Sequence, residues 1–191
     1  GGSYVTTGSD CAILYSTGTI SASNATGSSA KGEVGVIEGD NTINITNCNF
    51  SSGSSSRGLM ILQSGSGDSE GYNGAINITN STITLTDSSA PLCEIPTSIT
   101  GTLTLDNTSL TVPSGVLMYV DYNTRWSTYG GTGNLVLKNG SYTGAVNADQ
   151  YGTATVSVAS TATWTGSIDN SNVASSTTAT VEGVWILNAD S

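Results

Sequence analysis

The chain contains no histidine and few charged residues of either sign. Histidine is the commonest general base and the commonest transition-metal ligand. Its absence excludes catalysis by a Ser-His-Asp or Cys-His arrangement in this chain. Charged residues make up 9% of the 191 residues, against roughly 25% in an ordinary soluble domain. Serine, threonine, asparagine and glycine replace them, so we expect a nearly neutral surface rich in hydrogen-bonding groups.

Basic residues are especially scarce: the chain has 4 Lys and Arg and 14 Asp and Glu, so its net charge is −10. This balance argues against DNA, RNA and anionic membranes as partners, and it permits divalent cations. Long apolar runs are also missing. The longest apolar stretches are about five residues, whereas a membrane-spanning helix needs about 20, so we expect no membrane insertion.

Three cysteines occur, Cys11, Cys48 and Cys93, and an odd number does not make a complete disulfide framework. Cys11 and Cys93 are expected on one face but three coils apart. At about 4.8 Å for each coil, that gap exceeds the Cα separation of a disulfide, about 4.4–6.8 Å. The sequence therefore predicts buried free thiols that pack as small hydrophobic side chains.

A short sequence repeat recurs along the chain. It consists of two apolar residues separated by one polar residue, followed by a corner residue that is most often Asn. The clearest copies are Ile43-Asn44-Ile45-Thr46-Asn47 and Ile76-Asn77-Ile78-Thr79-Asn80. Apolar and polar alternation indicates a strand with one buried face. Asn tolerates the left-handed backbone region, so it can turn the chain at the end of each strand.

The copies start at residues 20, 43, 76, 103, 135, 156 and 179, and their spacing varies between 21 and 33 residues. Self-similarity at roughly 20–50 residues is typical of solenoids, propellers and arrays. Short strands without helices between them favour an all-β fold, a single right-handed parallel β-helix of about seven coils, in which loops vary while strands stay in register. The whole chain, 1–191, is expected to be one such domain.

Stacking of these coils predicts columns of like residues. One column is expected to contain Ile20, Ile43, Ile76, Leu103, Leu135 and Val156, and its neighbour Ala22, Ile45, Ile78, Leu105, Leu137 and Val158. The apolar residue three positions after each corner is expected to start a second short strand; these residues are Phe50, Ile83, Leu110, Tyr142 and Ile186. The corner residues Asn24, Asn47, Asn80, Asn107 and Asn139 should form a ladder of their own.

Four segments are expected to depart from the repeat. Residues 1–10 are interpreted as a polar lead-in, 63–74 and 121–134 as loop insertions, and 167–191 as a terminal coil and cap. A solenoid needs its last open coil covered, and we expect Trp185 to cover it.

Several stretches of the chain resemble a known family. They are Ala12-Ile13-Leu14-Tyr15-Ser16-Thr17-Gly18, Gly35-Val36-Ile37-Glu38-Gly39, Arg57-Gly58-Leu59-Met60-Ile61-Leu62-Gln63-Ser64 and Trp126-Ser127-Thr128-Tyr129-Gly130-Gly131-Thr132-Gly133. They are similar to the C-terminal region of secreted, Ser/Thr/Gly-rich, adhesin-like parallel β-helix proteins of bacteria and archaea. The resemblance implies the fold and says little about activity. The pectate-lyase pattern of clustered Asp residues and a basic residue on one face does not carry over to this sequence.

The two insertions are expected to rise on the same side of the solenoid and to enclose a shallow groove. The groove would be lined by Tyr72, Tyr122, Arg125, Trp126 and Tyr129. Aromatic faces beside polar groups suit a sugar ring. The alternative is that the insertions fold back and bury their rings against the solenoid.

Oxygen-bearing side chains offer two further kinds of site. Asp68, Glu70 and Asp121 are candidate calcium ligands, with solvated surface acids as the alternative; no other cofactor is expected. Asn44 and Asn77 lie in sequons and should point outward, so they are candidate glycosylation sites. Because the chain is rich in Asn, Ser and Thr, composition alone would produce several sequons.

The sequence thus favours a non-catalytic extracellular or cell-surface protein, structural or adhesive, that self-associates head to tail through open solenoid ends into a filament. The alternative is a carbohydrate-binding module that uses the insertion face, with surface glycans as partners. A third possibility is a polysaccharide lyase or a glycoside hydrolase, which would need two acids about 5–9.5 Å apart in a cleft.

Overall fold

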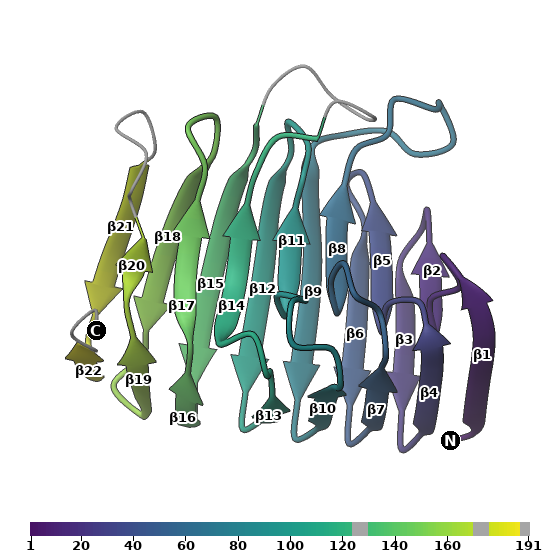
Figure 1. The fold of residues 1–191 in the computed structure, drawn as a ribbon, viewed down its shortest axis with the longest axis horizontal. Helices are drawn as coiled ribbons and strands as arrows, with labels where there is room; N and C mark the ends of the chain where they lie inside the picture. Colours follow the sequence, from purple (N-terminus) through teal and green to yellow (C-terminus); the bar gives the residue numbers. More distant parts are fainter. Residues whose placement is uncertain (124–129, 170–175, 188–191) are drawn as a thin grey trace.

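The computed structural model describes residues 1–123, 130–169 and 176–187. Within these ranges the chain consists of strands and connecting loops, without any helix. The strands stack in parallel, coil on coil, and form a right-handed β-helix of about seven turns, as the repeats predict (Figure 1).

Each coil of the first half crosses three parallel sheets in turn. Sheet 1 contains β1 (Ser3–Ser9), β4 (Thr26–Lys31), β7 (Asn49–Ser52), β10 (Thr82–Leu85) and β13 (Ser109–Thr111). Sheet 2 contains β2 (Leu14–Ser16), β5 (Gly35–Glu38), β8 (Leu59–Leu62), β11 (Cys93–Ile95), β14 (Val116–Val120), β17 (Ala145–Ala148) and β20 (Ile168–Asp169). Sheet 3 contains β3 (Ile20–Ser23), β6 (Thr42–Thr46), β9 (Asn73–Thr79), β12 (Thr100–Asp106), β15 (Thr132–Lys138), β18 (Thr153–Val158) and β21 (Ser176–Val181).

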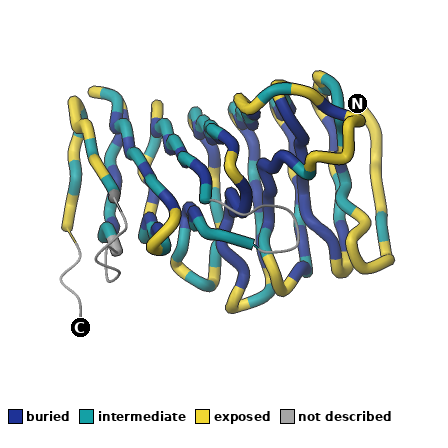
Figure 2. The backbone as a smooth tube through the Cα atoms, turned by 90° about the horizontal axis from the view of Figure 1, so that it is seen from above, coloured by how far each residue is buried: buried dark blue, intermediate teal, exposed yellow. Residues whose placement is uncertain are grey.

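The recurring sequence repeat forms the strands of sheet 3, and neighbouring strands pair in the predicted register. Ile43 pairs with Ile20 on one side and with Ile76 on the other, and the column continues through Leu103, Leu135 and Val156. From Ile43 to Val156 these side chains are fully buried. Burial of one such side chain contributes about 1.5–3 kcal/mol, so the column stabilises every coil. Figure 2 shows the buried stretches as dark bands that recur along the solenoid.

The corner asparagines adopt the left-handed conformation that the sequence predicts. Asn24, Asn47, Asn80, Asn107 and Asn139 have φ angles between 44° and 53°. Their amides also bond along the axis: Asn47 Nδ2 donates to Asn24 Oδ1 at 3.3 Å, and Asn107 Nδ2 donates to Asn80 Oδ1 at 2.7 Å. Asn139 instead donates to Asp106 Oδ1 at 2.7 Å. The ladder therefore combines turn propensity with amide pairing.

The residues that follow the corners by three lie in two different sheets. Phe50, Ile83 and Leu110 align in sheet 1, which ends at β13. Tyr142 lies in a separate sheet 4, made of β16 (Gly140–Thr143), β19 (Ala162–Gly166) and β22 (Val184–Leu187). There it aligns with Trp164 and with Trp185, the residue before Ile186. Trp185 stacks on the buried Trp164, with ring centroids 4.9 Å apart, at the C-terminal end of the core.

Residues 1–10, expected as a polar lead-in, contain a strand. Ser3–Ser9 forms β1, which pairs in parallel with β4 and adds a strand to sheet 1. Among the described strands β1 pairs with β4 alone, and polar residues occupy most positions on both of its faces. Cys11 follows Asp10, whose φ is 56°, and is exposed at this turn, whereas Cys48 and Cys93 are buried. All three thiols are free, but the prediction that they are all buried was wrong for Cys11.

The strands after the two insertions begin earlier than expected. β9 starts at Asn73 and β15 at Thr132, which leaves 63–72 and, among the described residues of the second insertion, 121–123 and 130–131 outside strands. Gly74, Gly101 and Gly133 stack in one inward column at these strand starts. A Cβ added at Gly133 would lie 2.5 Å from Val120 Cγ2, and one at Gly101 would lie 2.8 Å from Ile95 Cδ1. These glycines leave room for large residues of sheet 2.

Candidate functional site

Strands β5 and β8 are apolar on both faces. Ile37, Leu59 and Ile61 point into the core, while Val36, Met60 and Leu62 form a second apolar cluster outside it, with Ala12 packed against them. An outward cluster of this kind is buried only when neighbouring segments rise around it. Here it forms the floor of a groove on the outer face of sheet 2.

The groove has a volume of about 390 Å³, within the range of about 300–1,000 Å³ typical of small-ligand pockets. Its polar lining consists of Asp10, Tyr15, Glu33, Glu38, Ser56, Arg57 and Asn123. An apolar floor under a few converging polar groups is the usual construction of a ligand site. Because three carboxylates and one guanidinium line the groove, the groove carries a net negative charge.

One wall of the groove is Tyr15, whose side chain is 58% exposed. Its hydroxyl donates to Glu38 Oε1 at 2.8 Å, and Ser64 Oγ donates to Glu38 Oε2 at 3.0 Å. Partial burial, together with the Glu38 carboxylate, raises the pKa of Tyr15 to about 12. Tyr15 therefore stays a neutral hydrogen-bond donor, and Glu38 holds its ring in place.

The first insertion supports this wall by folding back on the preceding coil. Ser69 Oγ donates to the Glu38 carbonyl at 2.7 Å, and Asp40 N donates to the Glu70 carbonyl at 2.8 Å. Gln63 Nε2 bridges the carbonyls of Ser69 and Gly71. The loop is thus anchored along the corner beside β5.

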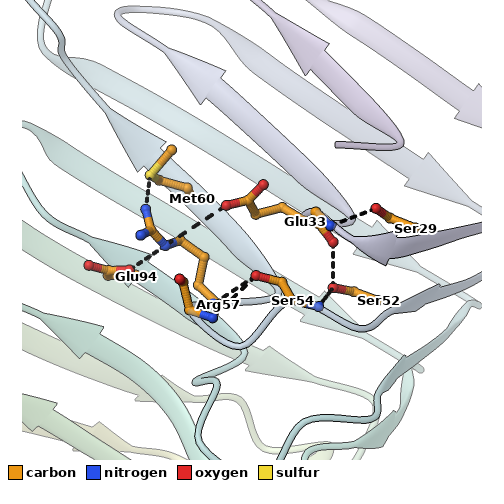
Figure 3. A network of polar contacts seen from close by, with 9 residues as sticks. Ser29, Glu33, Ser52, Ser54, Arg57, Met60 and Glu94 are labelled. Atoms are coloured by element: carbon orange, nitrogen blue, oxygen red, sulfur yellow. Dashed lines mark hydrogen bonds and ion pairs between the residues drawn. The ribbon is translucent and has the colours of Figure 1, made fainter. Parts of the chain in front are cut away.

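The opposite wall is built on Arg57, which lies between two acids in Figure 3. Arg57 Nε is 2.5 Å from Glu94 Oε2 and 4.0 Å from Glu33 Oε1. Its Nη1 lies 2.6 Å from the sulfur of Met60. Glu33 is only 7% exposed. The 4.0 Å between Arg57 Nε and Glu33 Oε1 is too long for a hydrogen bond, so the two residues form an ion pair only.

Beyond Arg57 the acids continue as a row. Glu94 is hydrogen-bonded to Asp121, the first residue of the second insertion, and Asp149 lies close enough to repel Asp121 electrostatically. Burial, and then the neighbouring Glu94 and Asp149, raise the pKa of Asp121 to about 7, while burial raises the pKa of Glu94. Two carboxyls in contact cannot both ionise cheaply, so this pair holds a proton near neutral pH.

The predicted glycan face is only partly within the described residues, because Arg125, Trp126 and Tyr129 lie outside them. Tyr72 is 59% exposed and borders a shallow depression of about 240 Å³ with Ser98, Gly130 and Thr132. Tyr122 instead packs against Tyr151, with ring centroids 4.8 Å apart and the rings tilted by 51°. Tyr72 and Tyr122 thus have different neighbours, and neither lines the groove on the outer face of sheet 2.

The predicted calcium ligands do not converge. Asp68 and Glu70 are exposed on the first insertion, whereas Asp121 belongs to the row with Glu94. Within 1–123, 130–169 and 176–187, no three acidic or cysteine side chains are grouped as metal ligands. Calcium binding by these three residues stays a prediction.

The sequon residues Asn44 and Asn77 alternate with the buried isoleucines and point away from the core, half-exposed. They are neighbours in the ladder, and Asn77 Nδ2 donates to Asn44 Oδ1 at 3.0 Å. A glycan on Asn77 would replace one of the hydrogens on this nitrogen. Their glycosylation stays a prediction.

Sequence reasoning missed the groove, although a signal was present. Val36-Ile37 and Leu59-Met60-Ile61-Leu62 lack the alternation seen elsewhere in the chain. A strand that is apolar on both faces must be covered on both, so these runs indicate a sheltered outer surface. Sequence reasoning also passed over Tyr15, Glu33 and Arg57, which come from three different coils.

Comparisons with protein-family models, with curated proteins and with solved structures give no match for this chain. The part of the chain that the structure describes contains no helix long and apolar enough to cross a membrane. The interpretation of function therefore depends on the geometry of the solenoid itself.

Proposed function

We propose that this chain is a non-catalytic structural solenoid of the cell surface or extracellular space, and that it extends head to tail by pairing its first coil with the last coil of a second copy. The extracellular location is supported by the sparse charge and the Ser/Thr/Asn/Gly-rich composition. The end-to-end contact is supported by the exposure of core positions at both ends.

Positions that are fully buried inside the solenoid become exposed in its terminal coils. Phe50 and Ile83 are buried, but Tyr4, in the same inward column of sheet 1, is 44% exposed. At the other end, Val181 continues the column of the buried Val158 and is 37% exposed. Leu187 lies beyond Gly166 in sheet 4 and is 66% exposed. These exposed apolar side chains are the observation that carries the proposal.

The two ends also match in strand direction and in chemistry. In the described parts of the chain, the strands of each terminal coil are hydrogen-bonded to a neighbouring strand on one side only. These strands are β1, β2 and β3 at one end and β20, β21 and β22 at the other. All neighbours within the solenoid are parallel, so a second copy can continue each sheet by translation along the axis. Stacking would extend the Ile20 and Ala22 columns onto Ala179 and Val181. A contact between two different surfaces that does not close produces a filament.

The test compares the wild-type protein with two double variants of its last coil. Val181→Lys with Leu187→Lys places charges at the inward end positions, where a stacked coil must cover them. Val184→Lys with Ile186→Lys adds the same charge at exposed outward positions of the same coil. Light scattering and negative-stain microscopy then report assembly as the protein concentration rises.

We expect linear assemblies from the wild type and from the outward variant, and single particles from the inward variant. A wild-type protein that remains monomeric at high concentration would contradict the proposal. Equal loss of assembly in both variants would attribute association to charge and not to coil stacking.

Carbohydrate binding by the insertion face is a second candidate. It is favoured by the exposed Tyr72 ring beside the depression near Thr132, since an exposed ring suits a sugar face. A glycan array tests it: a glycan that binds the wild type should lose that binding in Tyr72→Ala. The absence of any bound glycan would reject this candidate.

A further inference from the structure

We propose that the groove on the outer face of sheet 2 binds a small organic cation, an alkylammonium or alkylguanidinium, whose charged end pairs with Glu33 and Glu38 and whose stem covers Val36 and Met60. This proposal is independent of end-to-end assembly, because the groove lies on the side of the solenoid.

Glu33 is the residue that points most directly to a ligand. It lines the groove, and its side chain is 9% exposed. Within the described ranges its side chain has the 4.0 Å ion pair with Arg57 and no hydrogen bond. A carboxylate that is mostly covered by protein gains from each N–H donor that reaches it. A ligand that brings N–H donors into the groove would supply them.

Charge selects the class of ligand. Asp10, Glu33 and Glu38 line the groove against one cation, Arg57, which is closest to Glu94 outside the lining. An anion would meet unbalanced carboxylates, and a purely apolar ligand would leave them without donors. A cation gains both attraction and hydrogen bonds.

One guanidinium group of the chain itself, that of Arg57, already lies beside the acids and the apolar floor of the groove. Arg57 places its own guanidinium between Glu33 and Glu94 and against the sulfur of Met60 (Figure 3). Tyr15, held by Glu38, offers the exposed face of a phenol ring at the other wall, where cation–π attraction is available. A ligand of the same chemistry would use the free side of Glu33 and the apolar floor.

The experiment titrates the full chain with agmatine, with 1,5-pentanediol as a neutral chain of similar length, and with methyl glucoside as a neutral sugar. Calorimetry measures affinity, and backbone amide NMR shifts report the place of binding. We expect agmatine to bind, to shift the amides of Tyr15, Val36 and Met60, and to weaken as salt rises. Titration with an acetylated arginine methylamide separates a free amine ligand from an arginine side chain of a protein partner.

The key variant is Glu33→Gln, which keeps the shape and removes the charge. Loss of one charge-assisted hydrogen bond should lower agmatine affinity about tenfold or more. Glu182→Gln is the matched control, because it removes the same charge from the last coil. Circular dichroism checks that Glu33→Gln folds, and Glu38→Gln provides a second test if it does not.

Three outcomes would overturn the proposal. They are tighter binding of methyl glucoside or of pentanediol than of agmatine, equal weakening by Glu33→Gln and Glu182→Gln, and amide shifts confined to residues outside the groove. The first would assign the groove to a neutral ligand. The second would mean that only the net charge of the chain attracts amines.

Discussion

Asn107 shows how one residue type solves two problems at a solenoid corner. Its φ of 48° is in the left-handed region, and its amide donates to Asn80 at 2.7 Å. Other L residues enter this region at a cost of roughly 1–2 kcal/mol. Glycine enters it freely but has no amide. The backbone and the side chain therefore make separable contributions.

We expect Asn107→Ala to lower the free energy of unfolding by about 1–3 kcal/mol, since it suffers the backbone cost and loses the amide bond. Asn107→Gly should lose less, because only the amide bond and some chain entropy are affected. Urea unfolding of both variants measures the difference. If glycine is as damaging as alanine, the left-handed backbone is not the reason for asparagine at this corner.

Asp121 makes stability depend on pH in an unusual direction. Its folded pKa is raised to about 7 from 3.8, mainly by burial and then by Glu94 and Asp149. The folded state therefore holds a proton that the unfolded state has lost, so this contribution is complete below about pH 4 and disappears as pH rises through about 7. Most acidic proteins with ion-paired carboxylates show the opposite sign.

Asp121→Asn should flatten this dependence. Urea unfolding between pH 5 and pH 8 should show wild-type stability falling with rising pH relative to Asp121→Asn. Asp68→Asn, which changes an exposed acid, should follow the wild type. Parallel curves for the wild type and Asp121→Asn would remove Asp121 from the explanation.

At the scale of strands, the inward glycine column allows sheets 2 and 3 to meet at close range. A methyl group at Gly101 would lie 2.8 Å from Ile95 Cδ1 and 3.0 Å from Ile95 Cγ1. We expect Gly101→Ala to destabilise the fold by about 1–3 kcal/mol through overpacking. Ile95→Val removes Cδ1, so the double variant should recover part of that loss, which a double-mutant cycle measures. Strict additivity of the two changes would show that they do not share this space.

The sheet 3 strands were predictable because each places a single apolar residue at every second position, so one face and one register satisfy the pattern. Ile43 and Ile76 can stack in only one way without burying Asn44 and Asn77. The early starts of β9 and β15 were not predictable in this way. Gly74 and Gly133 look like loop residues in the sequence, and only the bulk of Ile61 beside Gly74 and of Val120 beside Gly133 explains them.

The groove was harder to predict for a related reason. Tyr15, Glu33 and Arg57 come from separate coils, and the connections between coils vary in length. Alternation in sheet 3 fixes the register of those coils there, but it does not fix how the connections arrive at sheet 2. Loss of alternation in Leu59–Leu62 revealed a covered face, but not the acids that would surround it.

At the scale of the whole molecule, each coil contacts chiefly the coils before and after it. Stability in such proteins is approximately a sum of coil contributions and neighbour interfaces. A coil should therefore be removable if the two cut ends preserve the alternation of sheet 3. The pairing of Ile76 with Leu103 marks equivalent points in consecutive coils.

Deletion of residues 76–102 joins Ala75 to Leu103 and keeps Leu103 at the inward position that Ile76 held. We expect this variant to fold as a shorter solenoid, with a β-rich circular dichroism spectrum and a cooperative urea transition at lower denaturant concentration. Deletion of residues 76–103 removes one residue more and joins Ala75 to Thr104. Because a one-residue slip exchanges the two faces of a strand, Thr104 would point inward and Leu105 outward. The longer deletion should therefore abolish the cooperative transition. Equal folding of both variants would mean that stacked apolar columns do not hold the coils together.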